Sequence, residues 1–209
     1  MSETVASTWW NSTTGSPPSR RPRVTASQQL RPARGPLPRT TTGKKATPQV
    51  FVEAAKELLD SGHTARFSIV GPDEGEAEAV NRLIERSGHS NCIQYEGPLP
   101  FDKSPERFRQ AAVYVLPSVN EPFPMSVLEA MAAGLPVVVT DTCGLAPLIR
   151  DGRCGLVTDD ATESVTAAIS SLLKDPVAAA EMGARARNVA RERLGMPAVR
   201  AVLETQYGL

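Results

Sequence analysis

Short runs of apolar residues alternate with helix-forming segments along most of this 209-residue chain. A run of four or five apolar residues is typical of a strand buried on both faces, and such strands occur in parallel sheets covered by helices. Strands are expected at 66–70, 92–95, 113–116, 137–140 and 155–157. Helices are expected at 47–61, 74–86, near 104, 125–133, 146–149, 163–173, 177–194 and 197–206. The pattern predicts an α/β fold, a Rossmann-like parallel sheet with helices on both faces.

Residues 1–46 differ in composition from the rest of the chain. They are rich in Ser, Thr, Pro and Arg, and they show neither helical nor strand periodicity. A segment of this kind buries too little apolar surface to offset the entropy of ordering its backbone. We therefore expect a disordered leader over 1–46 and one folded domain over 47–209.

Charge is unevenly divided between these two parts. The first 48 residues hold eight Lys or Arg side chains and one acid, Glu3, so their net charge is +7. Because the whole chain is neutral, residues 49–209 carry −7. An acidic body binds nucleic acid poorly, since Lys and Arg make the phosphate contacts. We expect no nucleic-acid partner.

Several other classes of protein are excluded by missing patterns. No apolar run approaches the length of a membrane span, and no apolar signal core stands near the N-terminus. We therefore expect a cytoplasmic protein, peripheral to the inner membrane face at most. Three cysteines without a C-x-x-C pair and two histidines offer no metal site. G-x-G-x-x-G, the P-loop and G-x-S-x-G are also absent, which argues against dinucleotide oxidoreductases, P-loop enzymes and serine hydrolases.

The helix expected at 125–133 carries one charged residue, Glu129, among apolar and small neighbours. Burial of a carboxylate costs free energy unless a partner donates hydrogen bonds to it. The hydroxyls of a sugar or a ribose would serve, and we favour this interpretation. The alternatives are that Glu129 faces a water-filled edge or pairs with a basic side chain.

The loop before that helix adds a second carboxylate, Glu121, at the carboxyl end of a strand. Backbone N–H groups around 123–126 then face outward at the helix N-terminus, where the helix dipole favours a phosphate or a diphosphate. Pro122 and Pro124 stiffen the approach, although Pro124 itself has no N–H to donate. A sugar nucleotide contains both the hydroxyls and the phosphates that this turn would bind.

Residues 121–129, with the sequence EPFPMSVLE, resemble the E-x7-E motif of family 4 retaining glycosyltransferases with the GT-B fold. The segments AMAAGLPVVVTD at 130–141 and DGRCGLV at 151–157 are also similar to that family, as is the strand that ends at Val70 and Gly71. The resemblance runs from about residue 48 to the C-terminus, and its motifs together are specific. It implies the C-terminal, donor-binding domain of a two-domain enzyme.

The resemblance also implies roles for individual residues. Glu121 would contact hydroxyls of the donor sugar and is the implied catalytic residue, while Glu129 would contact the ribose. The other implied contacts to the donor are Gly71, Leu99, Phe123, Pro124, Met125 and Ser126. Arg39 and Lys45 stand where the family has the Arg and Lys that bind the diphosphate. However, the expected Lys-Gly is replaced by Lys45-Ala46, and nothing before residue 48 resembles the family's acceptor domain.

Two functions therefore remain open. The first is the donor half of a glycosyltransferase that moves a sugar from a nucleotide sugar to an acceptor, with retention and without a metal or other cofactor, in polysaccharide or glycoconjugate synthesis. The second is a truncated module that binds a nucleotide sugar without transferring it, or that depends on a partner. The partner would be a separate acceptor domain or a second copy of the chain. A sugar-nucleotide epimerase and a decayed fragment are weaker alternatives.

Overall fold

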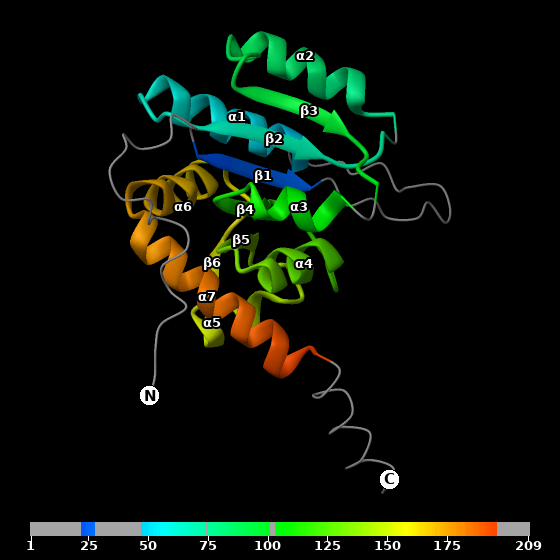
Figure 1. Cartoon of the computed structure of the whole chain (residues 1–209). Coiled ribbons are helices and arrows are strands. Elements are labelled where there is room, and N and C mark those ends of the chain that lie inside the picture. Colours follow the sequence, from blue (N-terminus) through cyan, green and yellow to red (C-terminus); the bar gives the residue numbers. More distant parts are fainter. Residues whose placement is uncertain (1–21, 28–46, 74, 101–102, 196–209) are drawn as a thin grey trace, which may run out of the picture.

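The computed structural model describes residues 22–27, 47–73, 75–100 and 103–195. Six strands form one parallel sheet in the order β3-β2-β1-β4-β5-β6 (Figure 1). Their bounds are β1 Arg23–Ser27, β2 Arg66–Val70, β3 Ile93–Gly97, β4 Val113–Leu116, β5 Val137–Thr140 and β6 Gly155–Thr158. The expected Rossmann-like α/β fold is confirmed.

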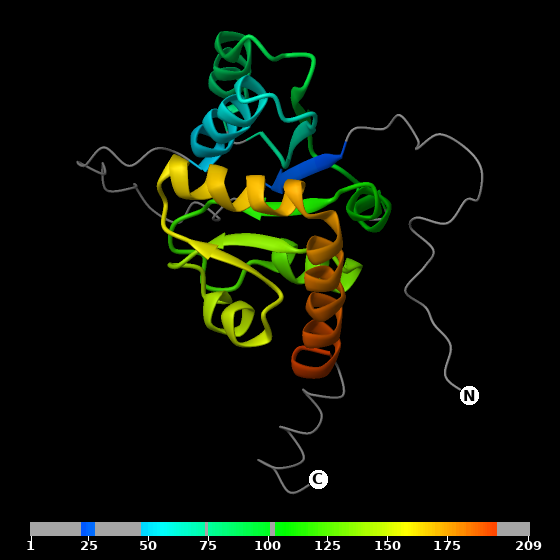
Figure 2. The ribbon, with the colours of Figure 1, turned by 90° about the vertical axis from the view of Figure 1, so that its left-hand side faces the viewer.

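Seven helices connect and cover these strands within the described residues. They are α1 Thr47–Asp60, α2 Ala77–Ser87, α3 Ser104–Arg109, α4 Met125–Ala133, α5 Ala146–Gly152, α6 Thr162–Lys174 and α7 Pro176–Arg193. In Figure 1, α3 and α4 lie in front of the sheet and α1 lies behind it. Figure 2 shows how α7 turns away from the end of α6. Helices therefore cover both faces, which explains why every residue of β4 and β5 is buried.

The core is divided by the sheet into two clusters. On one face, α1, α2 and α6 pack on alternate strand residues, with Phe51 and Phe67 edge to face at a centroid distance of 6.0 Å. On the other face, α3, α4, α5 and part of α7 pack on Tyr114, Leu116 and their neighbours. Alternate side chains of β4 enter opposite clusters, as the two-residue period of a strand requires.

Local capping signals set several helix ends where the sequence predicts them. The Asp175 carboxylate accepts a hydrogen bond of 2.9 Å from the Ala178 N–H, and Pro176 occupies the first position of α7. Gly134 ends α4 with φ +85°, in the left-handed region that glycine adopts without strain. β2, β4, α4 and β5 begin and end at the expected residues.

The expectation of a disordered leader over 1–46 is wrong at residues 23–27. These residues form β1, which lies in the middle of the sheet and pairs Val24 with Phe67 of β2 and with Val113 of β4. Val24 and Ala26 are buried among the residues of the α1 face. The strand carries only these two core residues, so its local pattern is weak, and pairing with strands 40 to 90 residues away stabilises it. The sheet therefore has six strands, and its domain includes residues before 47.

Smaller differences concern the ends of elements. α2 begins at Ala77, three residues later than expected, and β3 extends to Gly97. The helix expected at 197–206 lies outside the described residues. Among the helices that the structure describes, none is long and apolar enough to span a bilayer.

Candidate functional site

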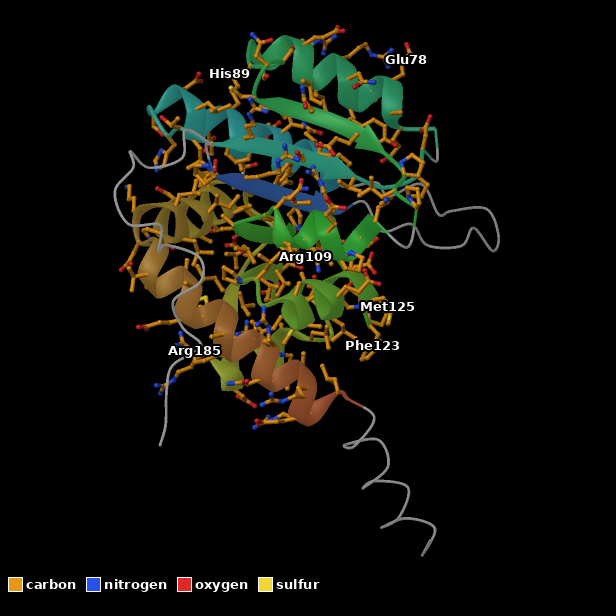
Figure 3. The ribbon with its side chains drawn as sticks, viewed as in Figure 1. Glu78, His89, Arg109, Phe123, Met125 and Arg185 are labelled. Atoms are coloured by element: carbon orange, nitrogen blue, oxygen red, sulfur yellow. The ribbon has the colours of Figure 1, made fainter. Side chains whose placement is uncertain are left out.

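The expected site residues gather at the edge of the sheet where the parallel strands end. Ligands bind at this edge in open α/β sheets, because the loops there lead into helix N-termini. The loop 117–124 after β4 carries Glu121 and leads into α4. Figure 3 shows Phe123 and Met125 at the side of the molecule toward which the strand arrows of Figure 1 point.

The first turn of α4 has no side-chain cap. Pro124 is the N-cap and offers no side-chain acceptor to the helix, and its carbonyl accepts from the Val127 N–H over 3.2 Å. Phe123 and Met125 are 56% and 55% exposed, although both are large apolar side chains. An exposed apolar pair beside a helix N-terminus suits a ligand that has an anionic group and a flat or apolar surface.

The Ser126 side chain is held by a hydrogen bond from the strand beneath α4. The buried Tyr114 of β4 donates a hydrogen bond of 2.6 Å from its hydroxyl to the Ser126 Oγ. The Tyr114 ring itself packs edge to face on Phe108, with 5.7 Å between centroids. Packing and hydrogen bonding therefore set the orientation of the first turn of α4.

Glu129 lies on α4 one turn after Ser126 and is half-buried. Burial raises the pKa of its carboxyl, and no charge or hydrogen bond opposes that effect. Within the described ranges, no side chain or backbone group pairs with it. A basic partner, one of the two alternatives to a ligand, is therefore not found there. A partly desolvated carboxylate of this kind can accept hydrogen bonds from ligand hydroxyls.

Glu121 is held at both its side chain and its main chain. The Ser118 hydroxyl donates to Oε1 of Glu121 over 3.1 Å, and the Gly144 N–H donates to the Glu121 carbonyl over 2.8 Å. The second carboxylate oxygen remains able to accept from a ligand. Glu121 thus lies in the loop before the first turn of α4, and Glu129 lies within the helix after it.

Gly71 and Leu99 lie in the neighbouring loops after β2 and β3. The Gly71 N–H donates to the Gly97 carbonyl over 3.0 Å, and the Tyr95 hydroxyl donates to the Gly71 carbonyl over 2.9 Å. These bonds join the two loops, and Leu99 is half-buried beside them. Arg39 and Lys45, the expected diphosphate contacts, lie outside the described residues.

Sequence reasoning missed the residues that support Glu121 and the first turn of α4. They are Tyr114, Ser118, Thr140, Thr142 and Gly144, which come from β4, β5 and the loops that follow them. One signal could have pointed to Ser118 and Thr140, because both are polar residues at the carboxyl ends of apolar strands. Their partners, however, depend on two loops meeting in space.

Metal chemistry has no obvious support in the described part of the chain. No group of three or more His, Cys, Asp or Glu side chains is arranged there to hold a metal ion. Cys143 and Cys154 are buried free thiols, and burial raises the pKa of both.

Comparison with known sequences places this arrangement in a family. The family Glycosyl transferases group 1 matches residues 39–175. The chain belongs to that family. It is 36% identical over 118 residues to a D-inositol 3-phosphate glycosyltransferase of Corynebacterium jeikeium, covering 54% of this chain and 28% of the relative. It is 35% identical over 146 residues to the enzyme of the same name from Nocardia farcinica, covering 66% of this chain and 32% of that relative. The chain spans about a third of the length of these curated relatives.

Solved structures share the fold at low sequence identity. Anabaena Alr3699/HepE in complex with UDP superposes with a TM-score of 0.72 at 20% identity, over 91% of this chain and 50% of that one. The C-terminal domain of a group 1 glycosyl transferase, LpcC of Francisella tularensis, superposes with a TM-score of 0.68 at 17% identity. The match covers 85% of this chain and 88% of that domain. The chain therefore covers about the length of one domain of a GT-B protein.

Proposed function

We propose that this chain is the donor-binding half of a retaining glycosyltransferase, which transfers a sugar from a nucleotide diphosphate sugar to an acceptor. The observation that carries the proposal is the pair of carboxylates, Glu121 and Glu129, before and after the first turn of α4. This arrangement fits a ligand with hydroxyls at two places and a diphosphate between them.

Each group has a distinct role in the proposed reaction. Glu129 accepts hydrogen bonds from the ribose hydroxyls, and Glu121 accepts them from hydroxyls of the donor sugar. Backbone N–H groups at the start of α4 bind the diphosphate, with the helix dipole favouring its negative charge. As the sugar leaves, negative charge grows on the diphosphate, so groups already oriented toward it stabilise the transition state. Arg39 and Lys45 add positive charge, and no metal is required.

The acceptor site, in this proposal, comes from a separate domain or from a second copy of the chain. Similarity to D-inositol 3-phosphate glycosyltransferases and to a UDP complex supports a nucleotide sugar as donor. We also propose that the protein acts in the cytoplasm, in polysaccharide or glycoconjugate synthesis. Cys143 and Cys154 are buried thiols outside any disulfide, which supports a reducing compartment.

Calorimetric titration with UDP, GDP, ADP and their glucose or mannose derivatives tests the donor site. We expect wild-type binding in the micromolar to millimolar range and a loss of about tenfold or more in Glu129→Ala, because a charged group contributes hydrogen bonds of about 1.5–3 kcal/mol. Glu78→Ala is the matched control, since Glu78 lies on α2, away from the turn (Figure 3). A folded wild type that binds no nucleotide would refute the proposal.

A nucleotide-sugar-binding module without transfer activity is the second candidate. It is favoured by the coverage of the relatives, since the chain corresponds to about a third of their length. The two candidates differ in whether the bound donor is consumed. Release of free nucleotide from the tightest-binding sugar nucleotide, with and without an acceptor domain from a homologue, separates them. Binding without release in both cases supports the second.

A further inference from the structure

The loop after β4, which carries Glu121, is fixed by hydrogen bonds from the neighbouring turn after β5. The Thr140 hydroxyl donates to the Ser118 carbonyl, and the Thr140 and Thr142 hydroxyl oxygens lie 3.1 Å apart. The Asn120 N–H donates to the Thr142 Oγ1 over 3.2 Å. Asn120 has φ +62°, in the left-handed region that asparagine adopts more readily than most other non-glycine residues.

These bonds can be assigned a single direction. Thr140 has one hydroxyl hydrogen, and the Ser118 carbonyl can only accept, so that hydrogen points to Ser118. The bond between the two threonines must then be donated by Thr142. Thr142 in turn accepts from the Asn120 N–H. The Ser118 hydroxyl donates to Oε1 of Glu121. The hydrogen bonds thus run from the Asn120 N–H through Thr142 and Thr140 to the Ser118 carbonyl. The hydroxyl of the same Ser118 then donates to the Glu121 carboxylate.

A backbone contact reinforces the same link. The Gly144 N–H donates to the Glu121 carbonyl over 2.8 Å. A Cβ at position 144 would lie 1.9 Å from the Pro122 carbonyl oxygen, so the two backbones approach more closely than any side chain allows. Glu129 has no part in these contacts, because it is placed by helix α4. The two carboxylates are therefore supported by different parts of the molecule.

We propose that Thr140 and Thr142 are positioning residues for Glu121, and that they set recognition of the donor sugar separately from recognition of the nucleotide. The inference rests on the proposed function. Thr140 is completely buried and cannot touch a ligand, so its effect must pass through Ser118 and the loop. The substrate selectivity of the site then depends on the turn after β5 as well as on the residues that touch the sugar.

The test compares affinities for a nucleotide and for its sugar derivative, with UDP and UDP-glucose as the first probes. Thr140→Val removes the hydroxyl with almost no change of shape. We expect it to lower the ratio of UDP-glucose affinity to UDP affinity about tenfold, with UDP affinity itself within about twofold of wild type. Thr140→Ser keeps the hydroxyl and should restore the ratio. Thr158→Val is the matched control, since Thr158 pairs with Thr140 in the sheet and its buried hydroxyl has no partner among the described residues.

Amide hydrogen exchange adds a readout that needs no ligand. Thr140→Val should speed exchange at Asn120 and Gly144 relative to Val138 in the strand itself, whereas Thr140→Ser should not. Unchanged exchange and an unchanged affinity ratio in a folded Thr140→Val variant would overturn the inference while leaving the proposed function intact. A wild type that binds neither this pair nor the other nucleotide sugars would instead refute the proposed function, and the inference with it.

Discussion

The Tyr114 hydroxyl lies 2.6 Å from the Ser126 Oγ, and this hydrogen bond joins the middle of β4 to the first turn of α4. The tyrosine is fully buried, so its hydroxyl needs a partner inside the protein. We expect Tyr114→Phe to lower the free energy of unfolding by about 1 kcal/mol, as measured by urea denaturation. Combining it with Ser126→Ala should add less than the sum of the two single effects. Full additivity would show that the two hydroxyls are not coupled.

Glu129 should reduce stability at neutral pH. Its folded-state pKa is raised by burial above the ordinary value of 4.5, so the unfolded chain gives up this proton at lower pH than the folded protein. Stability from this group is therefore highest below about pH 4.5 and falls as pH rises toward the folded pKa. Glu129→Gln should be more stable than wild type at about pH 7, and the difference should shrink at about pH 4. Urea denaturation at both pH values measures this.

The same substitution should weaken nucleotide binding. Glutamine accepts hydrogen bonds without a negative charge, so we expect a loss of about tenfold in affinity by calorimetry. A variant that is more stable yet binds less well would mark Glu129 as a residue kept for binding. A Glu129→Gln protein that is less stable at neutral pH would contradict the interpretation.

Gly183 allows α7 to pack directly against the end of α4. A Cβ at this position would lie 2.1 Å from the Gly134 carbonyl oxygen, and backbone cannot move aside as a flexible side chain can. We expect Gly183→Ala to cost about 2 kcal/mol or more of unfolding free energy, in the range of overpacked cores. Gly88→Ala is the control, because its Cβ meets nothing within 4 Å and only backbone strain of about 1 kcal/mol applies. Equal effects in thermal unfolding would argue against the close contact.

Asp175 caps α7 through its bond to the Ala178 N–H. Asp175→Ala should lower the unfolding free energy by about 1 kcal/mol, since the first turn loses its acceptor. Asp175→Asn keeps a side-chain oxygen and should retain most of the stability. If Asn and Ala were equally destabilising in urea denaturation, the negative charge and not the hydrogen bond would carry the effect.

Most of the α/β pattern could be predicted from the sequence because it depends on local signals. The apolar runs of β4 and β5 and the Asp175-Pro176 start of α7 are each specified by a few adjacent residues, and the structure has them where they are expected. The helix that follows Glu121, with its lone charge at Glu129, was also evident from residue types alone. The structure adds that burial, unopposed by a partner in the described residues, raises the Glu129 pKa.

Only the tertiary structure showed which residues form the central strand and which residues hold the Glu121 loop in place. β1 has a weak pattern of its own and forms a strand because β2 and β4 pair with it on either side. Likewise, Thr140 is an ordinary strand end in the sequence, and its link to Ser118 exists because two loops 22 residues apart meet at the sheet edge. Local propensity and periodicity act between neighbours in the chain and can be recognised there. Strand pairing and loop contacts act between distant residues, and they appear only when the chain is folded.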